Sequence, residues 1–188
     1  WSSSARIVVS GCAVNTFIEM CADGSGGTVI AWQDMRNGQQ DIFAQRVGSS
    51  GTAAWGPSGI AVCASDGEQW LPQLTYCDEG EVVAAWVDAR GGSDDIYMQR
   101  LAPDGSAMWM SGGLCVCGEA GSQLNPRILV DPRSNALIAW QDGRGASLDI
   151  YAQKIDRAGL ALWADGGLAI SAAEGDQRLP ELAPDGGG

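Results

Sequence analysis

Apolar runs of about five residues follow one another along the whole chain, separated by turns rich in glycine, proline and aspartate. Between residues 70 and 118 this pattern predicts four β-strands: Pro72–Cys77, Val82–Val87, Asp95–Leu101 and Gly113–Cys117. No segment keeps a 3.6-residue apolar period, so almost no helix is expected. The pattern therefore predicts an all-β protein.

The second of these strands is apolar at successive positions rather than at every other one. The same holds for its counterparts elsewhere in the chain, so the three segments are Thr28–Trp32, Val82–Trp86 and Ala136–Trp140. A strand without alternation is expected to be covered on both faces. That is the environment of a sheet packed between two neighbouring sheets.

These strands belong to an internal repeat of 54 residues. Its period is marked by Trp32, Trp86 and Trp140, and by a second series of Trp1, Trp55, Trp109 and Trp163. Four short strands in a unit of this length are typical of a β-propeller blade, whereas a β-helix, the alternative, has much shorter repeats. We therefore predict a β-propeller array whose blades have four antiparallel strands.

The repeat divides the chain into one continuous array over residues 1–188. Residues 1–26 form a partial blade, and three repeats follow at 27–80, 81–134 and 135–188. Additional strands are expected near both ends, at Arg6–Ser10 with Phe17–Ala22 and at Leu168–Ser171 with Pro180–Ala183. Three full blades are fewer than the 4–8 of a closed propeller, and unpaired strands invite pairing with another chain. Two explanations stay open: part of a longer protein, or a homo-oligomer.

The charge and composition of the chain argue against several classes of binding partner and of catalytic site. The chain has 23 acidic and 11 basic residues and a net charge of −12, which disfavours nucleic acid and anionic lipid surfaces. It has no run of 18 apolar residues, so no membrane insertion is predicted. Histidine is absent, which excludes Ser-His-Asp and Cys-His catalysis and histidine-ligated zinc.

Six cysteines occur without a CxxC pair, at Cys12, Cys21, Cys63, Cys77, Cys115 and Cys117. An even number in an acidic, tryptophan-rich chain favours disulfides and an extracellular or cell-surface location. The pairings Cys12–Cys21 and Cys63–Cys77 are disfavoured, because an extended strand of about 17–20 Å would separate their partners. We expect Cys115 and Cys117 to share the exposed face of an outer strand, where they could bond to a partner; small buried hydrophobic residues are the alternative.

A turn before the second tryptophan series resembles a known motif. The segment Ala102-Pro103-Asp104-Gly105-Ser106-Ala107-Met108-Trp109 is similar to a degenerate Asp-box, the S-x-D-x-G-x-x-W turn of sialidase-type propellers. Ser50 and Ala158 replace the aspartate in the other copies, while Gly51 and Gly159 keep the place of Gly105. The wider pattern AWxDxRxGxxDIYxQR also resembles secreted bacterial propeller repeats. The resemblance implies a propeller fold and a structural turn.

The most highly charged motif is Asp-x-Arg at the hairpin between the second and third strands of each repeat. It comprises Asp34, Asp88 and Asp142 with Arg36, Arg90 and Arg144. The resemblance to sialidase-type enzymes implies an arginine-lined face that grips a carboxylate. We favour the alternative that each arginine ties its own hairpin together, because the motif recurs in all three repeats. No unique tyrosine and glutamate pair is present, so no catalytic residue is predicted.

A ligand site is expected on the face where the second-to-third and fourth-to-first strand connections emerge. The non-repeating Trp70 lies there together with Arg36, Arg90 and Arg144, and its counterparts are Thr16 and Leu124. An exposed tryptophan can stack on a sugar, but packing against the blade edge is the commoner arrangement, and it is the one we favour. Glycan or peptide is the predicted ligand class for this face.

No metal site or cofactor is predicted. Calcium is the one alternative, at Asp94-Asp95 and the Asp-Gly turns, but no D-x-D-x-D-G loop is present. The sequence as a whole favours a non-enzymatic extracellular interaction module, self-associating through incomplete blade edges or belonging to a larger propeller. A carbohydrate- or peptide-binding propeller module is the alternative.

Overall fold

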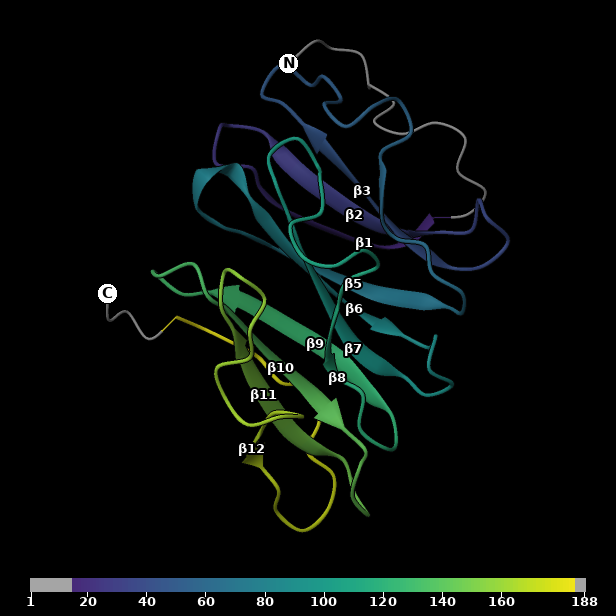
Figure 1. Cartoon of the computed structure of the whole chain (residues 1–188), viewed down its shortest axis with the longest axis vertical. Helices are drawn as coiled ribbons and strands as arrows, with labels where there is room; N and C mark the ends of the chain where they lie inside the picture. Colours follow the sequence, from purple (N-terminus) through teal and green to yellow (C-terminus); the bar gives the residue numbers. More distant parts are fainter. Residues whose placement is uncertain (1–14, 185–188) are drawn as a thin grey trace.

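The structure, a computed structural model, describes residues 15–184 and contains three four-stranded antiparallel sheets (Figure 1). Blade 1 comprises β1 (Asn15–Ala22), β2 (Thr28–Asp34), β3 (Asp41–Val47) and β4 (Ile60–Cys63). Blade 2 comprises β5 (Gln69–Tyr76), β6 (Val82–Asp88), β7 (Asp95–Leu101) and β8 (Leu114–Cys117). Blade 3 comprises β9 (Gln123–Val130), β10 (Ala136–Asp142), β11 (Asp149–Ile155) and β12 (Leu168–Ser171). A 3-10 turn, Asp78–Gly80, follows β5.

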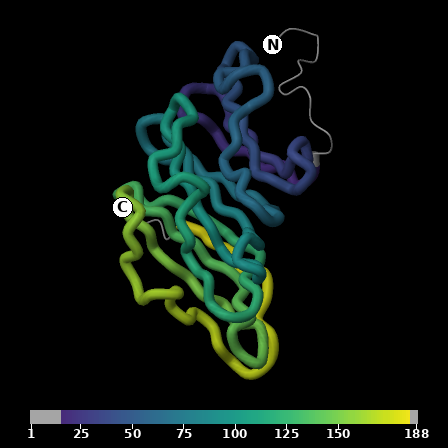
Figure 2. Tube along the Cα trace, turned by 45° about the vertical axis from the view of Figure 1, so that its right-hand side comes forward, coloured from purple at the N-terminus to yellow at the C-terminus, as the bar shows by residue number. Residues whose placement is uncertain are grey.

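Each blade is a meander in which consecutive strands are hydrogen-bonded neighbours. The first strands of adjacent blades contact one another, β1 with β5 and β5 with β9, while the fourth strands lie at the opposite edge of each sheet. Figures 1 and 2 show the three sheets following one another along the molecule, with β1, β5 and β9 toward the middle. We call β1, β5 and β9 the inner strands and β4, β8 and β12 the outer strands.

The apolar core lies between blades rather than within them. One cluster joins Val29, Ile42 and Val62 of blade 1 to Ala84 and Trp86 of blade 2. A second cluster joins the other face of blade 2 to blade 3. Blade 2 is therefore covered on both sides, and every residue of β6 is buried. This arrangement explains why the second strand of the repeat shows no alternation of apolar and polar residues.

The predicted strands agree closely with those observed. The third strand of the middle repeat, Asp95–Leu101, has the predicted bounds, and the second extends one residue further, to Asp88. The strand predicted at Phe17–Ala22 is β1, but it is not unpaired, because it pairs with β2 as the first strand of blade 1. The hydrogen-bonded sheets therefore begin at inner strands, whereas the sequence blocks 27–80, 81–134 and 135–188 begin just before second strands.

One predicted strand is not formed. Residues 180–183 belong to no sheet, because no strand among residues 15–184 pairs with them. The strand predicted at Arg6–Ser10 lies outside the described residues. Within the described part of the chain, no helix is long and apolar enough to cross a membrane.

Candidate functional site

A β-bulge interrupts each inner strand at the same place. In blade 2, Trp70 pairs with Val87 and Gln73 with Ala85, so that Leu71 and Pro72 together face the single residue Trp86. The same two-against-one register occurs in blades 1 and 3, opposite Trp32 and Trp140. Bulges bend a strand and redirect side chains, and they are common next to functional sites. The repeat therefore places three bulges side by side on the inner strands.

The first residue of each bulge has a left-handed backbone, although none is a glycine. The φ values are 48° at Phe17, 52° at Leu71 and 53° at Asn125. Such a conformation costs a non-glycine residue about 1 kcal/mol or more, and strain of this kind gathers at functional sites. Because the same backbone strain recurs at one place in all three blades, the space that these bulges surround is a candidate functional site.

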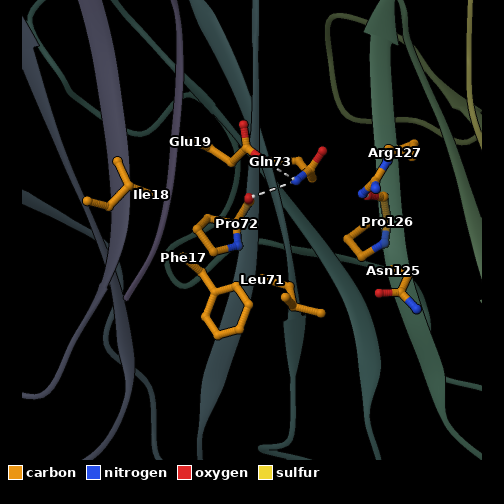
Figure 3. Close-up of a pocket in the computed structure, with 9 residues that line it drawn as sticks. All are labelled: Phe17, Ile18, Glu19, Leu71, Pro72, Gln73, Asn125, Pro126 and Arg127. Carbon is orange, nitrogen blue, oxygen red and sulfur yellow. Dashed lines mark hydrogen bonds between the residues drawn. The ribbon is translucent and has the colours of Figure 1, made fainter. Parts of the chain in front are cut away.

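The bulges line a cavity of about 240 Å³ between the inner strands, which we call the axial trough. Figure 3 shows its walls in three rows. The rows, each with one residue per blade, are Phe17, Leu71 and Asn125; Ile18, Pro72 and Pro126; and Glu19, Gln73 and Arg127. Except for Asn125, the first two rows are apolar, and the third is polar, as expected of a site that holds and orients a small ligand.

The polar row is joined by hydrogen bonds between residues one repeat apart. Gln73 Nε2 donates to Glu19 Oε1 at 3.0 Å, and Arg127 Nε donates to Glu181 Oε1 at 3.3 Å. Arg127 also donates from Nη1 to the carbonyl of Pro126 at 3.1 Å, while about a third of its side chain stays exposed. The Gln73 amide group also donates to the Pro72 carbonyl at 3.0 Å, so the polar row presents the partly exposed Arg127 guanidinium and the Glu19 carboxylate, next to an exposed aromatic ring at Phe17. This set can hydrogen-bond a neutral, hydroxyl- or amide-bearing ligand.

Sequence reasoning missed this trough. Pro72 was predicted to begin its strand, but the observed strands start three residues earlier, so that Pro72 lies inside β5 and Pro126 inside β9. A proline inside a strand is confined to edges and bulges, since it cannot donate to the ladder. Its recurrence at one repeat position is a signal for the bulges of β5 and β9.

The predicted arginines occupy equivalent positions in the fold, and each is enclosed by protein groups. Arg90 donates to Asp88 Oδ1 from Nε at 2.9 Å, to the Gly112 carbonyl at 2.7 Å and to Cys63 Sγ at 3.0 Å. Its guanidinium lies 4.1 Å from the centre of the Tyr97 ring. Gly112 precedes the outer strand of the same blade, and Cys63 belongs to the preceding blade. Arg90 thus bridges two blades as well as its own hairpin.

Arg144 and Arg36 make the corresponding contacts. Arg144 bonds Asp142, the Gly166 carbonyl at 2.6 Å and Cys117 Sγ at 3.2 Å, while Arg36 bonds Asp34 and the Ser58 carbonyl at 3.0 Å. About a fifth of each of the three arginine side chains is exposed. Most of their hydrogen-bonding capacity is directed into the fold. Ligand binding by these arginines stays a prediction that this geometry does not favour.

The tryptophan and aspartate of the same motif form the buried side of this arrangement. The indole Nε1 of Trp140 donates to Asp142 Oδ2 at 2.7 Å, and Trp86 and Trp32 bond Asp88 and Asp34 in the same way at 2.8 Å. All three carboxylates are fully buried. Burial opposes ionisation of Asp142, but hydrogen bonds from Arg144 and Trp140 outweigh it and lower its pKa. We call each such set of tryptophan, aspartate and arginine a hairpin node.

The second tryptophan series links consecutive blades. Trp55 is buried and donates from Nε1 to the Pro103 carbonyl of blade 2 at 3.1 Å. Trp109 donates likewise to the Arg157 carbonyl of blade 3 at 3.1 Å, and Trp163 is half-buried. Trp70 is also half-buried and packs against the cluster between blades 2 and 3. Its predicted role as a sugar platform stays untested.

The cysteines require a correction. The five that the structure describes, Cys21, Cys63, Cys77, Cys115 and Cys117, are free thiols, and Cys12 lies outside the described residues. The expectation that Cys115 and Cys117 share one exposed face is wrong, because Cys115 is exposed and Cys117 is buried. The reason is a bulge at Val116: Tyr97 pairs with Cys115 and Ile96 with Cys117, so the extra residue reverses the alternation.

The thiols at the ends of the outer strands belong to the hairpin nodes. Cys63 Sγ lies 3.8 Å from Asp88 Oδ2, and Cys117 Sγ lies 3.7 Å from Asp142 Oδ2. Burial raises the pKa of Cys117 to about 12, so it stays a neutral thiol at physiological pH. These contacts join the outer strand of one blade to the hairpin of the next.

The aspartates of the acidic turns accept hydrogen bonds from the backbone amides of their own turns. Asp23 accepts hydrogen bonds from the backbone amides of Ser25 and Gly27 and from Arg46. Burial works against ionisation of Asp23, but these bonds outweigh it and lower its pKa to about 2. Over residues 15–184 no group of three or more acidic or cysteine side chains is placed to hold a metal ion.

Comparison with known proteins supports the fold. The sequence matches no family model and no curated protein sequence. Among solved structures, 84% of the chain superposes on an endo-arabinase from Bacteroides thetaiotaomicron, with a TM-score of 0.56 and 13% identity. It also superposes on a putative glycoside hydrolase from Parabacteroides distasonis (84% of the chain, TM-score 0.54, 8% identity) and a putative TolB from Agrobacterium tumefaciens (88%, 0.50, 17%).

The chain covers 63%, 52% and 51% of these three structures, respectively. Together with the three four-stranded sheets, the similarity confirms the predicted all-β, propeller-blade architecture. At 8–17% identity the likeness concerns the fold alone.

Proposed function

We propose that this chain is a non-enzymatic interaction module whose two end blades are covered by further blades. These blades come from a second copy of the chain or from the remainder of a longer protein. The observation that carries the proposal is the unequal burial of one repeat position. Val62 is 5% exposed and Val116 is 8% exposed, whereas Ile170, their counterpart on blade 3, is 57% exposed.

The difference arises because blades 1 and 2 each have a following blade in the structure and blade 3 does not. Other positions on this face follow the same rule. Ile42 and Ile96 are fully buried, but their counterpart Ile150 is half-buried. Leu168 is 49% exposed. We call the surface formed by Leu137, Ile150, Trp163, Leu168 and Ile170 the blade 3 end face.

Blade 1 presents a comparable surface on its other side. Ile18 and Met20 are 59% and 63% exposed, whereas the counterparts of Ile18, Pro72 and Pro126, are buried between blades. Contiguous exposed apolar surfaces on a folded protein usually mark interaction sites. The chemistry of these two faces matches that of the interfaces already formed within the chain, so further blades of the same kind are the partners they fit.

The resemblance to Asp-box propellers and the structural likeness to glycoside hydrolases support the blade architecture of this proposal. They add no catalytic residues, because the recurring carboxylates and arginines are engaged in the hairpin nodes. The Asp104 turn supports the same interpretation: Asp104 accepts hydrogen bonds from the backbone amide and hydroxyl of Ser106, as a structural turn requires.

The proposal is tested by size-exclusion chromatography with light scattering over a range of concentrations. We expect the wild-type chain to show a mass above that of a monomer that rises with concentration, and Ile170→Glu to return it to a monomer. Met108→Glu is the matched control, since Met108 is exposed to 41% on the middle blade, outside both end faces. A strictly monomeric wild type with the same solubility as Ile170→Glu would contradict self-association.

A second candidate function is supported by the axial trough. Its apolar wall with Phe17 and its guanidinium and carboxylate groups fit a carbohydrate or a short peptide, with the bulges rather than the arginine face as the binding surface. Glycan-array binding that is lost in Phe17→Ala and Gln73→Ala would support the trough. Loss in Trp70→Ala alone would instead favour the predicted loop face, and no binding to glycans or peptides would reject the candidate.

A further inference from the structure

Residues 176–181 dock on blade 3 through the contacts by which the inner strands β5 and β9 dock on the preceding blade. The backbone amides that start β5 and β9 donate to a carbonyl in the preceding hairpin loop, and Gln177 does the same. These bonds are Gln69 N to Gln40 O at 2.8 Å, Gln123 N to Asp94 O at 2.7 Å, and Gln177 N to Leu148 O at 2.6 Å. The segment therefore lies where the inner strand of a fourth blade would begin.

The segment also has the backbone shape of an inner strand. Leu179 has a φ of 55° and donates from its amide to Gln141 Oε1 at 2.9 Å. Leu71, one of its counterparts, has a φ of 52° and donates to Gln33 Oε1 at 3.0 Å. The salt bridge from Arg127 to Glu181 extends the polar row of the trough by one more repeat. The segment thus has a left-handed residue at the position where the inner strands begin their bulges.

This segment lacks the partner that the other inner strands have. β5 pairs with β6 along its length, whereas no strand within residues 15–184 pairs with residues 177–184. Beside this open edge lies the blade 3 end face, with Ile170 and Leu168 exposed. An unpaired edge next to an uncovered apolar face is a template for strand addition.

We propose that this edge and the blade 3 end face together bind a β-hairpin of the repeat's own second-and-third-strand type, which becomes strands two and three of a fourth blade. The inference rests on the proposed function and names the partner of that end face. The argument is continuity with an established interface, since blades 1 and 2 already bind such hairpins at the equivalent surfaces.

The interfaces between blades 1, 2 and 3 show which residue types the bound hairpin needs. The face of its second strand that turns toward blade 3 must be apolar, because Ala84 and Trp86 of β6 fill the corresponding surface of blade 1. An aspartate must follow its tryptophan by two residues, because the outer-strand thiols Cys63 and Cys117 lie beside Asp88 and Asp142. Ser171 stands at the equivalent position of β12 and offers a hydroxyl in place of the thiol.

A further requirement concerns the turn after the third strand. Trp55 and Trp109 each donate an indole hydrogen bond to a carbonyl in this turn of the next blade, at Pro103 and Arg157. Trp163 is the equivalent donor on blade 3. A segment with the sequence of residues 81–106 meets all of these requirements, because it runs from the second strand through the turn at Pro103.

The test appends a second copy of residues 81–106 directly after Gly188, which keeps the repeat in register because position 189 lies two periods after residue 81. Hydrogen exchange followed by mass spectrometry then reports on the amides of residues 177–184. We expect exchange there to slow by at least about 100-fold relative to an appended segment of the same composition in scrambled order. Exchange equal to that of the scrambled control would overturn the inference.

Specificity for the end face is tested by Ile170→Glu in the extended chain. Ile170 is exposed in the chain as it stands, so this change leaves the fold intact and should abolish most of the added protection. Protection unchanged by Ile170→Glu would also overturn the inference. A wild type that self-associates while the appended hairpin gives no protection retains the proposed function and rejects the hairpin. A monomeric wild type whose appended hairpin is protected retains the hairpin and rejects self-association.

Discussion

Replacing Asp142 by asparagine removes the charge from one hairpin node while keeping its shape. Asp142 is fully buried and accepts hydrogen bonds from Trp140 Nε1 at 2.7 Å and from Arg144 N, Nε and Nη2 at 3.0, 2.8 and 2.6 Å. The asparagine oxygen can still accept from Trp140, but its amide group would face the donors of Arg144. Removing one partner of a buried ion pair costs about 3–5 kcal/mol. Arg144 is partly solvated, so we expect a loss of about 2–3 kcal/mol.

Urea unfolding followed by tryptophan fluorescence measures this loss, because Trp140 lies in the node itself. Asp104→Asn is the matched control, since Asp104 is exposed in a turn where asparagine keeps the same hydrogen bonds. Its cost should stay below about 0.5 kcal/mol. A cost of Asp142→Asn no larger than that of the control at pH 7 would refute a stabilising role for the node.

The same pair of proteins gives a second test through pH. The folded-state pKa of Asp142 is lowered, so it lies below the value of about 3.9 expected for an unfolded chain. The carboxylate therefore contributes stability that is fully present above about pH 4 and is lost as the pH falls through its folded pKa. The gap in unfolding free energy between wild type and Asp142→Asn should shrink in that range. A gap that stays constant down to about pH 2 would show that the charge does not act as described.

Two further predictions concern packing and thiol access. Gly113→Ala should lower the unfolding free energy by about 3 kcal/mol or more, because a β-carbon there would lie 2.4 Å from Trp86 Cη2. Gly92 has a similar φ of 91° and open space around it, so Gly92→Ala in the same denaturation assay measures the cost of backbone strain without the clash. An aromatic disulfide reagent at pH 8 should modify Cys115 fastest among the described cysteines, while Cys77, whose pKa burial raises to about 11, reacts only on unfolding; equal rates for the two thiols would contradict their assigned burial.

The blade architecture was predictable because each blade repeats the same local chemistry. Strands two and three are joined by the hairpin node, and the tryptophan, aspartate and arginine that build it are adjacent in sequence. Their spacing therefore predicts the hairpin and its bounds, as the agreement at Asp95–Leu101 shows. Lack of alternation around Trp86 predicted double burial correctly for the same reason, since that strand packs on both neighbours.

The features that were missed depend on single extra residues. The bulge at Val116 turns Cys117 inward and Cys115 outward, although the two cysteines are two residues apart. The bulge at Leu71 and Pro72 opens the axial trough in the same way. A bulge changes the face of every residue beyond it, and apolar runs without alternation carry no information about that shift.

The contacts that the arginines make outside their own hairpins could not be predicted from the sequence. The sequence favours a role in which each arginine ties its own hairpin together. Arg90 does bond Asp88, but it also reaches the Gly112 carbonyl before the outer strand and Cys63 of the preceding blade. Those partners lie 22 and 27 residues away in sequence. Only the folded sheet order brings them together.

The hairpin nodes explain why this repeat can bind more of its own kind. The hairpin nodes of blades 2 and 3 each contact a thiol from the outer strand of the preceding blade, Cys63 and Cys117 respectively. A blade is therefore stabilised through its neighbour, as in other repeat proteins whose energies are dominated by nearest-neighbour interfaces. On blade 3, Ser171 stands at the position of these thiols, and Ile170 beside it is exposed. Ser171 and the blade 3 end face therefore offer the surface that a hairpin node packs against, and a hairpin that brings the aspartate and tryptophan completes an interface whose chemistry the chain already uses twice.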